Sequence, residues 1–353
     1  MYYPVDVRVT PLTRLRRERL LPLSGEVLVN EGQEVEPSQV VARTYLPGDF
    51  HILPVARLLG VSSSKAKKFL RVERGDEVQQ GQVIAKRGML FGRAVKAPID
   101  GVVTASGGGR VLIESQPTLF ELQAYVPGEI IQVIEGYGVM IETSGALVQG
   151  VWGSGPEGVG VLRTLVKGPD RPLRADMLDP ACHGTILVGG RGLDEDVIER
   201  AEGLEVSGIV LGGFSADMLP AVEACPLPVV VTDGIEADAM AEPIFDLLST
   251  NEDREAVISG HFETRGKFVR PEVFVPLPAE SVPSTETQIG APLTAGARVR
   301  IARAPHLGKI GTVRQIPPHA SRTKTGVRAR GAIVDIGTEE PVFVPLANLE
   351  VIR

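Results

Sequence analysis

Three glycine-containing segments hold the residues best placed to do chemistry, because each follows an apolar run directly. Gly189-Gly190-Arg191 follows residues 186–188, Gly212-Gly213 follows residues 206–211, and Asp233-Gly234 follows residues 229–231. The carboxyl ends of parallel strands meet at one edge of a sheet, where ligands bind in open α/β folds. A small-molecule site at this edge is therefore one of two hypotheses for these residues, beside a purely structural role. Its candidate residues are Gly189, Gly190, Arg191, Gly212, Gly213, Ser215, Asp233 and Gly234.

The chemistry of this edge argues against a phosphate ligand. The helix after the first glycine pair opens with Asp194-Glu195-Asp196, whose carboxylates satisfy its positive end and repel an anion. The Gly-x-Gly-x-x-Gly spacing of dinucleotide-binding loops is also missing. Tight turns between strands and helices require glycine as well, so a purely structural role stays open for these residues.

No group of side chains has the spacing of a catalytic site. The five histidines form no metal-binding pattern, and Cys182 and His183 are neighbours in the chain, which rarely orients a nucleophile toward its base. The glycine-rich run at residues 150–160 lacks the Gly-Lys-Ser/Thr ending of a P-loop. Whether the chain is an enzyme therefore stays open.

The elements that would position the glycine loops alternate between strand and helix. Apolar strands are predicted at residues 186–188, 206–211, 229–231 and 255–259. Helices are predicted at 193–204, at 218–224 with an Asp217 cap, and up to residue 248 with an interruption at Pro243. Continuous apolar strands alternating with helices predict a small parallel sheet buried on both faces. We assign this α/β domain, with a β-rich entry, to residues 125–275.

A proline-rich linker at residues 276–292 precedes a small β unit at 293–353. This unit contains ten Arg or Lys residues and four Asp or Glu residues. Arg298 and Arg300 share one strand face by the period-2 rule, as do Arg328 and Arg330, so contacts with phosphates are feasible. A solvated surface, or one that docks on the acidic remainder of the chain, is the alternative. The candidate nucleic-acid-binding residues are Arg298, Arg300, Arg303, Lys309, Arg328 and Arg330.

The segment from Pro305 to Val313 in this unit resembles the KOW motif of SH3-like barrels in ribosomal proteins and transcription elongation factors. The resemblance covers about sixty residues and implies an SH3-like barrel. It leaves the function open, because this fold serves many tasks.

An internal repeat occupies the first hundred residues. Residues 29–42 match residues 72–85 at a constant offset of 43, with Val, Gly, Glu, Val, Gln, Val and Ala coinciding. Gly32 and Gly75 mark turns with positive φ, and Val35 and Val78 are expected to point inward. Two copies suggest two half-barrels related by a pseudo-twofold axis.

The second copy, followed by Ala97-Pro98-Ile99-Asp100-Gly101, resembles biotinyl/lipoyl carrier domains and their barrel-sandwich hybrid relatives. The resemblance covers residues 20–115, with an unusual insert at 45–70. Such carriers hold the acylated lysine on a hairpin about seven residues before the Ala-Pro pair. Met89-Leu90-Phe91 occupies that place here, and Leu90 has no amine to acylate. We therefore expect no biotin or lipoate, and a barrel used for packing or docking at residues 1–124.

Bulk properties restrict the remaining functions. The net charge of −7 does not steer the whole chain to nucleic acid or anionic membrane, and two isolated cysteines favour neither disulfides nor a zinc site. There is no signal peptide pattern and no apolar stretch of about 18 residues, so we expect a cytoplasmic protein without membrane partners.

The predicted fold is multi-domain α/β plus β: a barrel-sandwich hybrid, a small parallel-sheet α/β domain and a C-terminal SH3-like barrel. The predicted function is that of a non-enzymatic binding or scaffold protein that contacts RNA, DNA or a ribonucleoprotein through the basic barrel, or else a protein partner. The alternative is a small-molecule-binding protein or enzyme with its site at the glycine loops.

Overall fold

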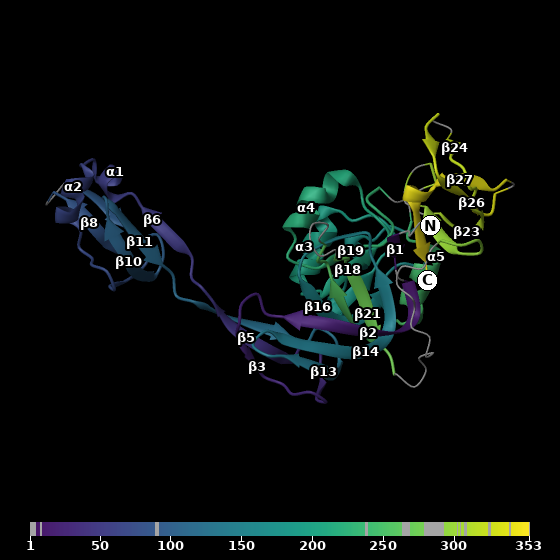
Figure 1. Cartoon of the computed structure of the whole chain (residues 1–353), viewed down its shortest axis with the longest axis horizontal. Helices are drawn as coiled ribbons and strands as arrows, with labels where there is room; N and C mark the ends of the chain where they lie inside the picture. Colours follow the sequence, from purple (N-terminus) through teal and green to yellow (C-terminus); the bar gives the residue numbers. More distant parts are fainter. Residues whose placement is uncertain are drawn as a thin grey trace.

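The computed structural model describes residues 5–7, 9–88, 92–236, 239–262, 269–278, 293–301, 303, 305–306, 309–323, 326–338 and 340–352. The described chain is mostly β and forms several sheets, none of which closes into a barrel through the pairings of these strands. Figure 1 shows an elongated molecule with a small unit held away from the main body by a narrow two-stranded connection. No helix in the described part of the chain has the length and apolarity needed to cross a bilayer.

The largest sheet has eleven strands and forms the main body. Strand β14 pairs with β13, with β21 and, along most of its length, with β2. The bounds of the strands, in sheet order, are β15 (Trp152–Ser154), β19 (Val229–Val231), β18 (Gly208–Leu211), β17 (Thr185–Val188), β16 (Glu157–Thr164), β20 (Glu255–Ser259), β21 (Glu272–Pro276), β14 (Gly138–Gln149), β13 (Gly128–Ile134) and β4 (Glu34–Val35), with β2 (Val9–Leu20) beside β14.

Four neighbouring strands of this sheet, β16 to β19, are parallel, which confirms the predicted parallel sheet. Strand β20 runs antiparallel to β16, so the prediction of residues 255–259 as a fourth parallel strand is wrong, and β16 takes that place. Helices α3 (Glu195–Gly203) and α4 (Leu219–Ala224) pack on one face with Leu187, Ile209 and Val231, and α5 (Glu242–Thr250) packs on the other with Ile186, Val210 and Val230. Short 3-10 turns lie at η2 (Ala175–Met177), η3 (Pro180–Cys182) and η4 (Ala216–Met218).

Two helix details differ from the sequence-based expectation. Pro243 lies in the first turn of α5 and begins the helix, because a missing N–H costs nothing there. Asp217 belongs to the 3-10 turn η4 and does not cap α4, whose N-cap residue is Met218 without a side-chain hydrogen bond.

The sequence repeat corresponds to two complete copies of one β unit, not to two halves of one barrel. Val29, Val35 and Val41 lie in a core with Ile130 and Ile141, whereas Val72 and Val78 lie in a separate core with Val103 and Ile113. The second copy is inserted in the chain within the first. We therefore call residues 15–46 with 118–142 the outer copy and residues 50–115 the inner copy, with both names referring to the order in the sequence. The expected pseudo-twofold barrel is therefore wrong, since each copy buries its own apolar residues.

Backbone hydrogen bonds match between the copies. The Gly32 N–H donates to the Ile130 carbonyl and the Gly75 N–H to the Val103 carbonyl, both at 2.8 Å. The Ala124 N–H donates to Gln39 at 2.9 Å, as Ala97 does to Gln82 at 2.8 Å. These equivalences extend the repeat to residues 124–130 and 97–103, at an offset of 27, where the sequences share little.

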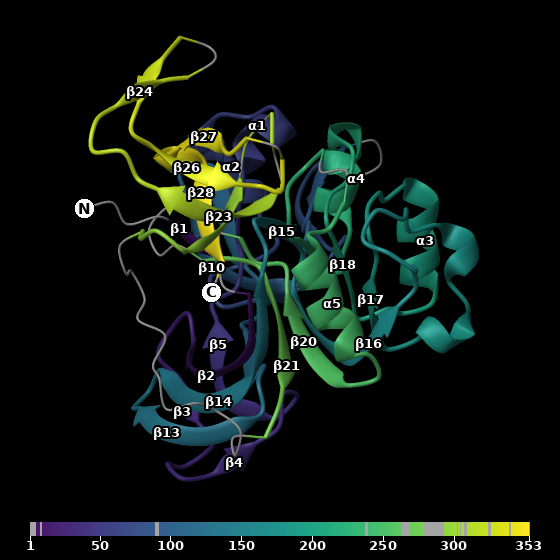
Figure 2. The same cartoon turned by 90° about the vertical axis from the view of Figure 1, so that its right-hand side faces the viewer.

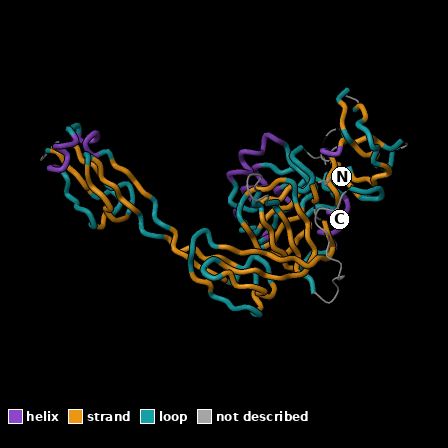
Figure 3. The backbone as a smooth tube through the Cα atoms, viewed as in Figure 1, coloured by secondary structure: helices purple, strands orange, loops and turns teal. Residues whose placement is uncertain are grey.

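The inner copy interrupts a hairpin of the outer copy. Strands β5 and β12 pair Val40 with Gln123, and β8 and β9 pair the equivalent Val83 with Lys96. Only five residues, 88–92, separate β8 from β9 in the chain, whereas the whole inner copy stands between β5 and β12 (Figure 3). The predicted insert at 45–70 is thus the entry to the inner copy. Met89-Leu90-Phe91 lies outside the described residues.

The remaining elements of the two copies are short. The outer copy adds β3 (Glu26–Val27), β5 (Val40–Leu46) and β12 (Thr118–Gln123). The inner copy contains β6 (Phe50–Leu53), α1 (Val55–Leu59), α2 (Ser63–Ala66), η1 (Lys67–Phe69), β7 (Glu77–Val78), β8 (Val83–Arg87), β9 (Arg93–Lys96), β10 (Gly101–Gly107) and β11 (Arg110–Glu114).

The C-terminal unit forms a six-stranded sheet that includes a strand from the start of the chain. Its order is β1 (Val5–Val7), β28 (Leu349–Ile352), β22 (Arg298–Ile301), β23 (Ile310–Gln315), β26 (Gly331–Asp335) and β27 (Val342–Pro345), with η6 (Leu346–Asn348) before β28. Strand β1 is parallel to β28. A separate ribbon, β24 (Ser321–Arg322) with β25 (Arg328–Ala329), projects from this sheet (Figure 2). Of the predicted linker, only residues 276–278 are described.

The separate cores predict independent responses to equivalent mutations. Ile113 and Ile141 occupy matching positions and are both fully buried, so alanine at either site costs about 2–5 kcal/mol. We expect I113A to speed amide hydrogen exchange in residues 50–115 only, and I141A to speed exchange across the outer copy and its sheet. Loss of protection in the main body of I113A would contradict the two-core structure.

Candidate functional site

The three glycine loops lie side by side at the carboxyl edge of the parallel strands, as the sequence predicted. Their backbones continue the pairing of the strands beyond the sheet. The Gly212 N–H donates to the Gly190 carbonyl at 2.9 Å, and the Asp233 and Gly234 N–H groups donate to the Gly212 carbonyl at 2.9 and 3.1 Å. The Gly192 N–H donates to Gly213 at 2.8 Å. These amides are therefore already used within the protein.

The same edge is filled by protein atoms. A Cβ atom on Gly190 would lie 2.6 Å from the carbonyl oxygen of Arg171 and 2.7 Å from those of Gly168 and Pro169. A Cβ on Gly212 would collide with the backbone of Met240. The glycines are required because two chain segments cross directly over them. Gly189, Gly190, Gly212 and Gly213 are all buried, so they line no open crevice.

Near this edge, carboxylates of the protein accept hydrogen bonds from the backbone N–H groups at the starts of α3 and η4. The Asp194 side chain accepts a hydrogen bond from the Val197 N–H at 3.0 Å and caps α3. The Glu236 carboxylate accepts from the Ala216 N–H at 2.6 Å, next to the exposed Ser215. Arg191 is exposed at the rim. Internal carboxylates thus take the positions that an anion would seek.

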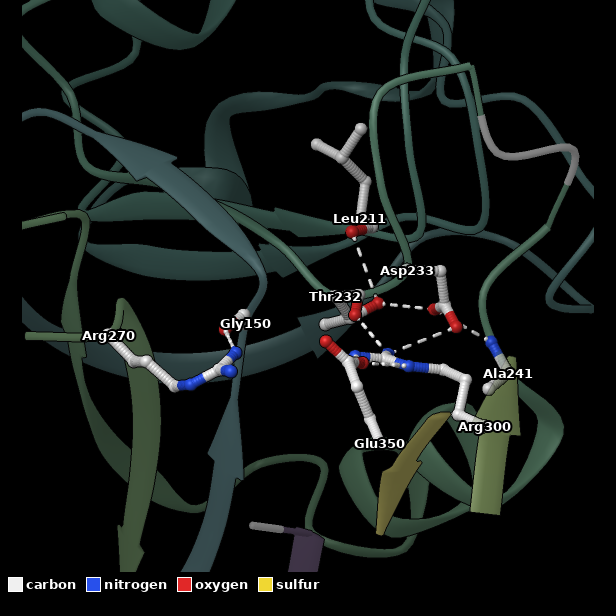
Figure 4. Close-up of polar contacts among 8 residues, drawn as sticks. All are labelled: Gly150, Leu211, Thr232, Asp233, Ala241, Arg270, Arg300 and Glu350. Carbon is white, nitrogen blue, oxygen red and sulfur yellow. Dashed lines mark hydrogen bonds and ion pairs between the residues drawn. The ribbon is translucent and has the colours of Figure 1, made fainter. Parts of the chain in front are cut away.

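Asp233 and Arg300 belong to two different predicted sites, and the structure joins them in one buried cluster (Figure 4). The Arg300 side chain is 1% exposed. Its Nη1 lies 3.3 Å from Asp233 Oδ1 and also donates to the Thr232 carbonyl. Its Nη2 donates to Glu350 Oε2 at 2.7 Å and its Nε to the same oxygen at 3.0 Å.

The second oxygen of Asp233 is also satisfied. Oδ2 accepts from Thr232 Oγ1 at 2.7 Å and from the Ala241 N–H, at the start of α5, at 2.9 Å. Burial raises the pKa of the Asp233 carboxyl, and the Arg300 guanidinium opposes part of that rise. A buried charge is tolerated only when it is paired and hydrogen-bonded, and this cluster meets both conditions. It joins the C-terminal sheet to the α/β sheet.

The predicted nucleic-acid-binding residues divide into one buried and five exposed side chains. Arg300 is unavailable to an outside partner, because the segment after β19 covers its face of β22. Arg298 is exposed on the same strand, and Arg303, Lys309, Arg328 and Arg330 are exposed as well. The period-2 rule placed Arg298 and Arg300 on one face correctly, but it could not show that only part of that face is covered.

The β24–β25 ribbon, with its flanks, forms a basic arm that we define as residues 319–330. Arg322 and Arg328 are directly opposite each other across the ribbon, and Arg330 follows. No Asp or Glu occurs between Gln315 and Asp335. Figure 2 shows this arm standing away from the rest of the C-terminal sheet. Like charges opposite each other are destabilising, so the arm gains nothing internally from this arrangement.

Cys182 and His183 do not form a nucleophile–base pair. Cys182 is fully buried, and Arg163 Nη1 lies 3.5 Å from its sulfur. His183 is exposed, and its Nδ1 lies 3.2 Å from the Leu204 carbonyl. Among the residues that the structure describes, no group of three His, Cys, Asp or Glu side chains could hold a metal ion.

A cavity of about 520 Å³ lies where the outer copy meets the end of β21, in a region for which the sequence suggested no site. Its charged lining comprises Arg14, Glu34, Glu129 and Glu142, and its wall includes Ser144. Arg14 lies 3.6 Å from Glu142, and the Ser144 hydroxyl donates to Leu277 at 2.8 Å. No pattern at these scattered positions indicates a site, because four separate strands, β2, β4, β13 and β14, bring them together.

No known protein family and no curated protein sequence matches this chain. Its function must therefore be inferred from the arrangement of its own residues.

Removing Arg300 should destabilise the protein strongly. Methionine at this position leaves the buried Asp233 without its cation, a change that typically costs about 3–5 kcal/mol. R298M alters an exposed arginine on the same strand and should stay within about 0.5 kcal/mol of the parent. Denaturant unfolding of both variants measures the difference. Equal stabilities of R300M and R298M would contradict a structural role for the cluster.

The packed glycine edge makes a second prediction. G190A should lower the free energy of unfolding by about 1–3 kcal/mol, because the new methyl group meets three carbonyl oxygens. G203A is a suitable control, since a Cβ at this helical position has no neighbour within 4 Å. We expect G203A to be neutral or stabilising by up to about 1 kcal/mol. A neutral G190A would indicate an open edge.

Proposed function

We propose that this chain is a non-enzymatic scaffold protein that binds nucleic acid through its basic C-terminal arm. In this proposal the outer and inner copies are barrel-sandwich hybrid units without an attachment lysine, and the C-terminal sheet is an SH3-like unit. The observation that carries it is the arm itself, a projecting ribbon that bears Arg322, Arg328 and Arg330 and lacks any carboxylate.

The arm suits the sugar–phosphate backbone better than an internal partner. Its arginines are exposed, and none of the three is joined by an ion pair to another described residue. By contrast, Arg314, on β23 of the same sheet, is paired with Asp335 at 2.5 Å. Arginine binds phosphate oxygens in a bidentate manner, and a duplex supplies them at regular spacing. The partner can be RNA, DNA or a ribonucleoprotein.

The alternative, a small-molecule-binding protein or enzyme with its site at the glycine loops, receives less support. The segment at residues 168–171 covers Gly190, and Met240 covers Gly212. A ligand could enter only if both coverings moved.

Charge reversal on the arm tests the proposal. R322E/R328E/R330E should weaken binding of a duplex of about 20 base pairs by roughly tenfold or more at low salt. It should also reduce the slope of log K against log salt by about two to three. Fluorescence anisotropy over a salt series measures both effects on duplex DNA and duplex RNA.

The matched control is K167E/R171E/R254E, which changes the net charge by the same amount at exposed positions of the main body. We expect this control to bind nearly as the parent does. If both triple variants weaken binding equally, the effect is one of overall charge and the arm has no special role. If the parent does not bind at low salt, the proposed function is wrong.

A further inference from the structure

The far end of the inner copy carries a second concentration of positive charge. Figure 1 places α1, α2 and β8 at the end of the molecule most distant from the main body. Four segments contribute cations there: α1, the α2–η1 segment, the β8–β9 hairpin and the start of β11. We call this surface the basic tip. Its exposed side chains are Arg57, Lys65, Lys67, Lys68, Arg87, Arg93 and Arg110.

Direct contacts hold these segments together. Arg87 Nη1 donates to the carbonyl oxygens of Leu59 and Gly60, at 3.2 and 2.9 Å, where α1 ends. A Cβ on Gly60 would lie 3.0 Å from Arg93 Nη1, so both arginines lie beside the end of this helix. A Cβ on Gly109, the residue before Arg110, would lie 3.1 Å from the Ser63 side chain. The tip is therefore one continuous surface.

Carboxylates are excluded from the tip. Residues 50–115 contain eleven Arg or Lys and five Asp or Glu, a balance of +6 in a chain whose total is −7. The five acids lie outside residues 50–72 and 78–99. Glu77 and Glu114 both pair with Val102, at the opposite end of β10 from Arg110. None of the seven tip cations forms an ion pair with any described residue.

The outer copy serves as an internal comparison. Arg87 and Arg93 are directly opposite each other in the β8–β9 hairpin, and the equivalent pair in the outer copy is Thr44 with Phe120. There the exposed Arg43 is neutralised by Glu26 at 2.8 Å and faces Glu121 across the strands. The outer copy thus forms the same fold without like charges directly opposite each other on neighbouring strands, an arrangement that weakens a strand pair. The inner copy retains them at a cost in stability.

The helical segment is a further difference between the copies. Residues 55–69 form α1, α2 and η1 in the inner copy, whereas only a short turn connects β2 to β3 in the outer copy. This segment supplies Arg57, Lys65, Lys67 and Lys68, and its three lysines follow a run of three serines. The repeat folds without it, so its cations are additions to the basic unit.

We propose that the basic tip binds the phosphate backbone of double-stranded nucleic acid, as a second contact surface distinct from the C-terminal arm. The inference takes the class of its partner from the proposed function, but it rests on different residues. A surface that inserts into a membrane needs a broad apolar face besides its cations. On the described helical elements of the tip, Leu58 is the one large exposed apolar side chain, so these helices present no broad apolar face to a membrane.

Two contact surfaces on one chain would raise the affinity for a long duplex that reaches both above that of either surface alone. We expect the tip to contact the sugar–phosphate backbone without sequence preference. Its lysine and arginine side chains bind phosphate oxygens, and such contacts carry no sequence information. Its binding should be strongly salt-dependent.

Full-length K65E/K67E/K68E tests the inference, with K65Q/K67Q/K68Q to separate loss of charge from reversal and K167E/R171E/R254E as the matched control. The probes are duplex DNA, duplex RNA and vesicles rich in phosphatidylserine. We expect K65E/K67E/K68E to weaken duplex binding about tenfold and to lower the salt slope by about two. The glutamine variant should show a smaller loss, and the control should show none. Thermal unfolding verifies that each variant is folded.

The arm and the tip fail in distinguishable ways. If R322E/R328E/R330E binds duplexes as the parent does while K65E/K67E/K68E has lost binding, the tip is supported and the proposed function of the arm is wrong. If the tip variant binds duplexes as the parent does, the inference is overturned, whatever the arm variant shows. Loss of vesicle binding alone, with duplex binding intact, would assign the tip to anionic lipid and overturn it as well.

Discussion

The architecture depends on the backbone pairing of one strand, β14. Over its twelve residues both edges are used: β2 lies along one side, and β13 and then β21 lie along the other. Its first half carries Ile141 into the core of the outer copy, and its second half carries Ala146 and Val148 into the core under α5. A strand with two paired edges cannot slip or bend freely, so the outer copy and the α/β sheet share one frame.

Polar contacts complete what the strand pairing begins. Nη2 of Arg17, on β2, donates to both carboxylate oxygens of Glu272 on β21. Arg19 forms a bidentate pair with Glu157 on β16, so both arginines tie the outer copy to the sheet. Arg300 does the same for the C-terminal sheet through Asp233, while Glu350 pairs with it from the neighbouring strand of its own sheet. These ion pairs thus hold the outer copy and the C-terminal sheet to the large sheet. Among the described residues, exposed cations without an ion pair include those of the arm and of the basic tip, and both of these surfaces lack acids.

Sequence reasoning succeeded where the pattern was local. Apolar runs such as 229–231 located the parallel strands, and the Val29–Ala42 repeat indicated a duplicated unit. It could not show that the copies are nested, because residues 124–130 and 97–103 share little beyond an alanine, a glycine and their backbone roles. Nor could it show that Arg300 is covered or that Gly190 lies under another segment. Both depend on contacts between residues more than 15 positions apart, and such contacts produce no periodic pattern in the sequence. The pairing of β1 with β28 could not be predicted for the same reason, because the two strands lie at opposite ends of the chain.

The nesting of the two copies has a consequence for the order in which the protein can assemble during synthesis. All residues of the inner copy have been synthesised once translation has passed residue 115. In the outer copy, β2 and β4 lack their partner strands, and β5 lacks β12, until residues 118–149 follow. Strand β1 is synthesised first but can pair only at the end of synthesis, since its partner β28 lies near residue 350. Assembly on the ribosome therefore proceeds from the inside outward, and the early segments 9–20 and 26–46 are the ones exposed to mispairing or chaperone capture in the interval.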